Sequence, residues 1–130
     1  MKQLLLAFAL IAAPVAAFTG FQVYYARDVS AATAGLGDLS AFKTIVADVQ
    51  SIAAKGDFAA AAKRVTDYES AWDQAETVLR PLNSAYWGNV DAASDAALKA
   101  LREKTPSADR VNKTLAALMG VLDDPAQPAH

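Results

Sequence analysis

The sequence predicts an all-α protein: an antiparallel up-down four-helix bundle preceded by an N-terminal apolar signal or anchor helix. Three observations predict this fold class. Apolar residues recur at steps of three and four along most of the chain, the spacing of one helix face. Alanine, a strong helix former, supplies much of the 54% hydrophobic content. Short turn signals separate the helical stretches, which favours antiparallel neighbours, and no stretch shows the two-residue alternation of a strand.

Residues 1–25 have the features of an export signal. Lys2 precedes an apolar run that extends from Leu4 to Phe18. Val15-Ala16-Ala17 places small residues at the third and first positions before a cut, so a mature protein would start at Phe18. If the chain is cut there, we expect the product to be soluble.

The same segment also fits an uncleaved membrane anchor. Leu4 to Tyr25 is 22 residues, and a helix of that length reaches roughly 33 Å, enough to cross a hydrocarbon core. Tyr24 and Arg27 suit a membrane interface, whereas Pro14 interrupts the helix. Both alternatives predict an exported body, either in the periplasm or tethered to the cytoplasmic membrane and facing the periplasm.

The first two helices follow a connector. We expect residues 26–38, which are rich in serine, alanine and glycine, to form a flexible connector, and residues 39–122 to form the bundle. The first helix is expected over about residues 39–55. Gly56 suits the left-handed position that ends it, and Asp57 can cap the next helix. One apolar face of this first helix carries Leu39, Phe42, Ile45, Val46, Val49, Ile52 and Ala53.

The second helix is expected from Phe58 to Arg80-Pro81, where proline removes a backbone donor and breaks the helix. Its apolar stripe consists of Phe58, Ala61, Val65, Tyr68, Trp72, Ala75 and Leu79. The third helix is expected to start at Leu82 and to be interrupted near Gly88. Its buried face consists of Tyr86, Val90, Ala93, Ala97 and Leu101.

The fourth helix is expected to use Thr105 as its N-cap and Pro106 as its first residue. Val111, Leu115, Leu118 and Leu122 repeat along it. Asp123-Asp124-Pro125 closes the helix, and residues 123–130 predict a disordered tail.

Composition excludes several function classes. The net charge of -2 provides no basic field, which argues against a nucleic-acid partner. The absence of cysteine excludes disulfides, thiolate chemistry and cysteine-based metal sites. The single histidine is His130, so a nucleophile–base pair would need the end of the chain. The sequence therefore predicts a protein that is not an enzyme and has no cofactor.

Two rows of acidic residues form a candidate metal site. Asp73 and Glu76 lie on the second predicted helix, and Asp91 and Asp95 lie four apart on the third. If the rows faced each other, their carboxylates could hold a hard cation such as calcium or ferric iron. The alternative is an ordinary solvated face, balanced by basic residues nearby.

Three aromatic residues form a candidate groove for a ligand or partner: Trp72, Tyr86 and Trp87. Aromatic residues at helical spacing more often fill a core, and Trp72 lies on the predicted stripe. Trp87 lies outside the main stripe and beside Gly88, which makes it the better candidate for an exposed or pocket role.

A pattern in the middle of the chain resembles one group of bacterial proteins. It runs from Trp72-Asp73-Gln74-Ala75-Glu76 through Trp87 to Asp91 and Asp95. Over roughly residues 57 to 122, the chain resembles uncharacterised small exported α-helical proteins of alphaproteobacteria, some of which carry the label histidine kinase. The resemblance implies an exported helical protein. A kinase would need a phosphoacceptor histidine inside a helix and an ATP-binding domain, and this sequence has neither.

The sequence thus predicts a non-catalytic exported helical bundle that serves as a protein-interaction or ligand-binding module. Its expected partner is an envelope protein or a small ligand. The alternative function is that of a carboxylate-lined metal-binding accessory protein of the cell envelope.

Overall fold

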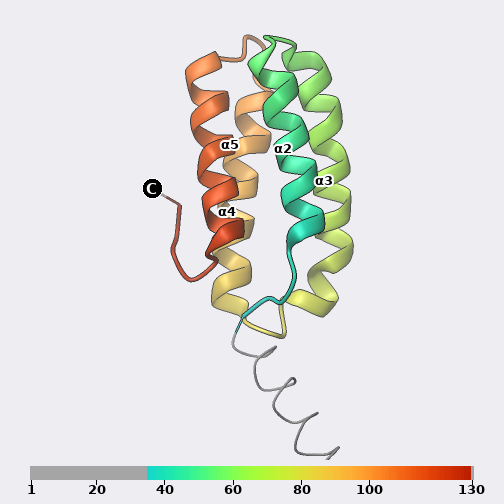
Figure 1. Ribbon diagram of the computed structural model, residues 1–130, viewed down its shortest axis with the longest axis vertical. Coiled ribbons are helices and arrows are strands. Elements are labelled where there is room, and N and C mark those ends of the chain that lie inside the picture. Colours follow the sequence, from blue (N-terminus) through green and yellow to red (C-terminus); the bar gives the residue numbers. More distant parts are fainter. Residues whose placement is uncertain (1–34, 130) are drawn as a thin grey trace, which may run out of the picture. The chain divides into compact units, whose positions relative to one another are not determined.

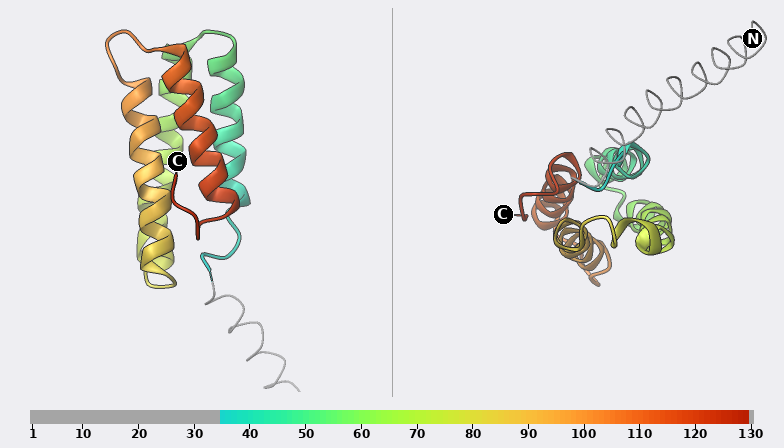
Figure 2. Two further views of the ribbon diagram at one scale, coloured as in Figure 1. Left: turned by 90° about the vertical axis from the view of Figure 1, so that its left-hand side faces the viewer. Right: turned by 90° about the horizontal axis from the view of Figure 1, so that it is seen from below.

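The fold is an antiparallel four-helix bundle, as the sequence predicts. A computed structural model describes residues 35–129. The helices are α2 (Ser40–Ala54), α3 (Phe58–Leu79), α4 (Ser84–Leu101) and α5 (Ala108–Asp123) (Figure 1). Each helix packs against two neighbours, with α2 beside α3 and α5, and α4 beside α3 and α5. The end-on view in Figure 2 shows the four helices at the corners of a square around one core.

The predicted N-terminal apolar helix, Leu4 to Tyr25, lies outside the described residues. Within residues 35–129, no helix is both long enough and apolar enough to span a membrane.

The core consists of the predicted stripes, with tyrosine and tryptophan supplying volume that alanine lacks. Most of its aliphatic members are valine and leucine, and each helix contributes at least two buried side chains. The largest fully buried side chains are Trp72, Tyr68, Leu115, Leu118, Val46, Val49, Val65, Val90 and Val111. Since alanine buries little apolar area, these larger side chains supply most of the hydrophobic stabilisation.

The predicted turn between the first two helices is confirmed. Gly56 has φ of 80°, the left-handed conformation that glycine adopts without strain. Asp57 is the N-cap of α3, and its Oδ1 accepts a hydrogen bond from the Ala60 backbone N–H at 3.0 Å. The capping carboxylate satisfies a donor that the first turn of the helix leaves unpaired.

The third helix differs from the prediction at its start and at Gly88. It begins at Ser84, and the N-cap is Asn83, whose Oδ1 accepts from the Tyr86 N–H at 3.1 Å. The helix continues without interruption through Gly88. One glycine in a helix interior costs only about 1 kcal/mol, and nearby Tyr86, Trp87 and Val90 pack in or against the core.

The fourth helix also begins later than predicted. Ser107, rather than Thr105, is its N-cap and accepts from the Arg110 N–H at 3.4 Å. Thr105 and Pro106 lie in the turn before it. Serine is as good a capping residue as threonine, and Asp109 in the first turn complements the positive end of the helix dipole.

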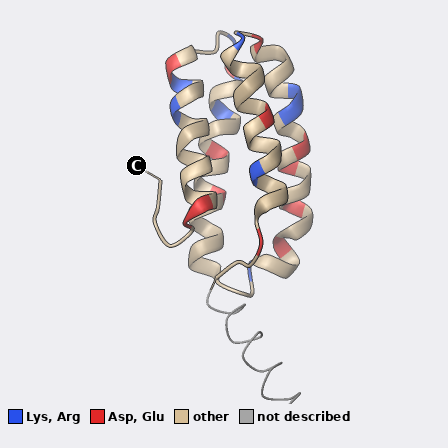
Figure 3. Ribbon diagram, viewed as in Figure 1, with Lys and Arg blue, Asp and Glu red and all other residues tan. Residues whose placement is uncertain are grey.

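Charged residues occur on all four helices (Figure 3), and ion pairs join three of the four seams between neighbouring helices. Arg64 of α3 pairs with Asp48 of α2 at 2.9 Å, and Lys43 of α2 pairs with Asp123 of α5 at 2.9 Å. At the seam between α3 and α4, both NH groups of Arg102 donate to Glu69. At the fourth seam, Arg110 of α5 pairs with Glu103, which lies in the turn after α4.

The α3–α4 ion pair is bidentate, with N···O distances of 2.9 and 3.1 Å. The hydrogen bonds from Arg102 lower the pKa of the Glu69 carboxyl. This pair adds a polar link between the two helices that carry the candidate aromatic and acidic residues.

The ends of the bundle are more ordered than the sequence suggests. Leu36, inside the predicted flexible connector, is only 3% exposed and belongs to the core. Residues 124–129, predicted as a disordered tail, fold back along the bundle, and the Asn89 side chain donates to the Pro125 carbonyl at 2.9 Å. Apolar burial and one hydrogen bond therefore hold segments that their composition alone marks as loops.

Candidate functional site

A row of aromatic rings lies between α3 and α4. Tyr68 and Trp72 stack at a centroid distance of 6.3 Å, and Trp72 stacks on Trp87 at 5.9 Å. Phe42 of α2 meets Trp72 edge to face at 5.3 Å. Offset stacking and edge-to-face packing are the geometries that aromatic pairs favour. Trp72 is only 2% exposed, so it belongs to the core.

Trp87 lies at the outer end of this row and is partly buried. The Arg80 guanidinium lies over its ring, 5.1 Å from the centroid, in a cation–π contact. The Trp87 indole N–H is buried and has no hydrogen-bond partner among the described residues. Tyr86, the third member of the predicted aromatic groove, packs against the core from the side. The rings of Trp72, Tyr86 and Trp87 are therefore mainly engaged in packing contacts within the bundle.

Asp73, Glu76 and Asp95 lie near enough to Asp91 to act on its charge. Asp91 accepts a hydrogen bond at 3.2 Å from the indole N–H of Trp72. Partial burial raises the pKa of the Asp91 carboxyl, and the negative charges of Asp95, Glu76 and Asp73 raise it further. Carboxylates from both predicted rows therefore influence the charge of Asp91.

This proximity does not produce a ligand shell in the part of the chain that the structure describes. No group of three or more carboxylate or imidazole side chains is arranged there to hold a metal ion. Glu76 is already paired with Arg80 at 2.9 Å. The carboxylates thus share an electrostatic field without converging on one point.

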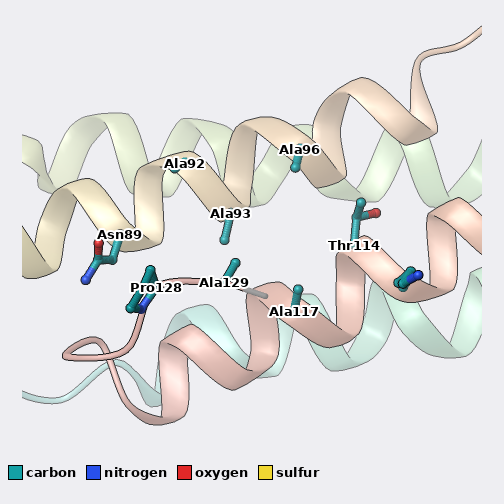
Figure 4. Close-up of a pocket in the computed structure, with 9 residues that line it drawn as sticks. Asn89, Ala92, Ala93, Ala96, Thr114, Ala117, Pro128 and Ala129 are labelled. Atoms are coloured by element: carbon teal, nitrogen blue, oxygen red, sulfur yellow. The ribbon is translucent and has the colours of Figure 1, made fainter.

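A groove of about 310 Å³ runs along the seam between α4 and α5 (Figure 4). Asn89 and Pro128 lie toward one end, and Ala96 and Thr114 toward the other. Small side chains leave the space open between the two helices. Four alanines form its walls: Ala92, Ala93, Ala96 and Ala117.

The C-terminal segment covers one side of this groove. Pro128 and Ala129 contribute to its lining, and the hydrogen bond from Asn89 to Pro125 holds the start of the segment. A second space of about 310 Å³ is lined by the same segment together with Gly120 and Val121 of α5. The segment therefore lines both spaces beside α5.

Sequence reasoning missed the α4/α5 groove. The available signal was a set of alanine pairs at positions 92–93, 96–97 and 116–117, which place small side chains on adjacent faces of two helices. The pairs alone indicate close helix packing. The position of the C-terminal segment, which completes the groove, depends on contacts that no local pattern predicts.

Comparison with protein families, with characterised proteins and with solved structures gives no match to this chain. Functional argument therefore depends on the groove, the aromatic row and the acidic group themselves.

Proposed function

We propose that the protein is a non-catalytic ligand-binding module of the bacterial cell envelope, which takes a small apolar molecule into the α4/α5 groove. The observation that carries this proposal is the groove of about 310 Å³ with alanine walls. Its volume lies at the lower end of the range of small-molecule sites, about 300 to 1,000 Å³.

The seam between α4 and α5 is linked by an ion pair at the turn, where Arg110 pairs with Glu103. This pair lies outside the set of residues that line the groove. A single hydrogen bond from Asn89 holds the C-terminal segment beside the groove. These features support entry of a ligand there without the loss of a strong polar contact.

Export is part of the proposal and rests on the sequence. The Leu4–Tyr25 segment favours a protein that works in the periplasm, free or tethered to the cytoplasmic membrane. The mass of the protein recovered from the envelope fraction tests this step. A chain that starts at Phe18 indicates cleavage, one that starts at Met1 indicates a tether, and recovery only from the cytoplasm contradicts export.

Binding of the neutral dye N-phenylnaphthylamine, followed by its fluorescence, tests the site. We expect saturable binding, weakened at least about tenfold, or about 1.4 kcal/mol, by Ala96→Leu. Ala96 is exposed, so its larger replacement fills the groove without entering the core. Ala116→Leu, an exposed alanine of α5 that does not line the groove, is the matched control. Absence of saturable binding, or equal weakening by both variants, contradicts the proposal.

A cation-binding function has less support. The carboxylates near Asp91 raise its pKa through their negative charge. However, Glu76 is paired with Arg80, and no set of three ligands converges among residues 35–129.

A further inference from the structure

The two ends of the α4/α5 groove differ in chemistry. Lys113 lines the groove and precedes Thr114, which lies toward the end away from Asn89 and Pro128. The walls between them are alanine methyl groups. No carboxylate lines the groove among the described residues. The groove thus combines an apolar floor with one positive charge at its edge.

Lys113 is exposed, and the described part of the chain provides no ion-pair partner for it. Lys43, Arg64 and Arg102, which lie at the other seams, are each paired. An ammonium group on a four-carbon stem can follow an apolar wall and keep its charge at the water boundary. Lys113 is therefore placed to meet an anion whose apolar part lies in the groove.

The dimensions restrict the apolar part to one chain. Asn89 and Ala96 are seven positions apart on α4, which corresponds to about 10 Å along the helix. A volume of about 310 Å³ over that length accommodates one extended hydrocarbon chain of medium length. A two-chain lipid exceeds this space.

We infer that the α4/α5 groove binds a medium-chain fatty acid, with its carboxylate at Lys113 and its hydrocarbon chain against the alanine walls toward Pro128. This inference rests on the proposed function and adds the ligand's class and orientation. Burial of methylene groups supplies most of the affinity, and the lysine selects an anionic head over a neutral or cationic one.

Displacement of N-phenylnaphthylamine by three ligands of equal chain length, each below its micellar concentration, tests the inference. The ligands are decanoate, decanol and decyltrimethylammonium. We expect decanoate to bind about three- to fivefold more tightly than decanol, the range of one partly exposed charge pair. The cationic ligand is expected to bind most weakly.

Lys113→Met keeps an apolar stem and removes the charge, so it should abolish the preference for decanoate over decanol. Lys99→Met, on an exposed lysine of α4 outside the groove, is the matched control and should keep the preference. Circular dichroism of both variants checks that the bundle is intact.

The outcomes separate this inference from the proposed function. Equal affinities for decanoate and decanol, or an unchanged preference in Lys113→Met, overturn the placement of the carboxylate while the apolar site remains. Failure of all three ligands to displace the dye overturns the inference, and failure of the dye itself to bind overturns both proposals.

Discussion

The indole N–H of Trp72 donates to Oδ1 of Asp91 at 3.2 Å and so joins the buried tryptophan of α3 to a carboxylate of α4. The contact places an acceptor beside a donor that the core would otherwise leave unpaired. It also keeps a negative charge close to Asp95, Glu76 and Asp73. Asp91 therefore stabilises the bundle through its oxygen and destabilises it through its charge.

The first prediction concerns the charge of Asp91. Because burial and neighbouring carboxylates raise its pKa above the ordinary 3.8, the folded protein binds this proton more tightly than the unfolded chain does. The free energy of unfolding contributed by Asp91 therefore falls as pH rises from 3.8 through the folded-state pKa, and the penalty is complete above it. Asp91→Asn keeps an acceptor for Trp72, so we expect it to remove this pH dependence and to be at least as stable as the wild type at neutral pH.

Urea unfolding between about pH 4 and about pH 7 measures this effect. Asp91→Ala is the informative comparison, because it also removes the charge but leaves the Trp72 N–H without its acceptor. It should unfold with about 1 to 3 kcal/mol less free energy than Asp91→Asn. An Asp91→Asn variant with the pH slope of the wild type would show that other carboxylates cause the dependence.

The second prediction concerns a buried hydrogen-bond chain. Ser94 Oγ donates to the Val90 carbonyl at 2.8 Å, so the Tyr68 hydroxyl, 2.7 Å away, donates to Ser94. Ser94→Ala leaves the buried Tyr68 hydroxyl without a partner and should cost about 1 to 3 kcal/mol of unfolding free energy. Tyr68→Phe leaves the Ser94 bond to Val90 intact and should cost about 0.5 to 1.5 kcal/mol.

The double variant provides the test of this assignment. Adding Tyr68→Phe to Ser94→Ala removes the unpaired hydroxyl, so the combined loss in urea unfolding should be clearly smaller than the sum of the single losses. Additive losses, or a larger cost for Tyr68→Phe than for Ser94→Ala, would contradict the direction of donation.

The parts of the fold that the sequence predicted are those that depend on neighbouring residues. Gly56 and Asp57 form a turn through backbone conformation and one capping bond, both local properties. The stripe of α3 places Val65, Tyr68 and Trp72 in the core because helical periodicity alone brings them to one face.

The remaining features depend on how helices meet. Trp87 lies outside the predicted stripe of its helix, yet it stacks on Trp72 because α3 and α4 bring the two rings to one seam. The sequence could place four acidic residues in two rows. The distances between their carboxylates decide whether they only repel one another or bind a metal ion, and those distances depend on how the helices pack. The α4/α5 groove required in addition the fold-back of residues 124–129, which no periodic pattern indicates.

The third prediction compares two glycines with opposite roles. A methyl group added at either Gly56 or Gly88 would meet no atom within 4 Å, so only backbone preference differs between them. Gly56→Ala forces a side chain into the left-handed conformation and should lower the unfolding free energy by about 1 kcal/mol or more. Gly88→Ala lies within α4 and should raise it by about 0.5 to 1 kcal/mol. Thermal unfolding measures both, and a loss of stability in Gly88→Ala would instead favour the interruption that the sequence predicted at this position.

The fourth prediction concerns calcium and the acidic group. One oxygen of Asp91 accepts from Trp72, and Glu76 is held by Arg80, so the carboxylates of this group are not free to converge on one cation. Millimolar calcium should therefore leave tryptophan fluorescence unchanged, as Trp72 and Trp87 lie beside the group and would report a rearrangement. Ionic strength is matched with sodium chloride, because general screening also relieves the repulsion around Asp91. A saturable change that calcium produces and the Asp91→Asn, Asp95→Asn variant abolishes would establish the metal-binding alternative in place of this prediction.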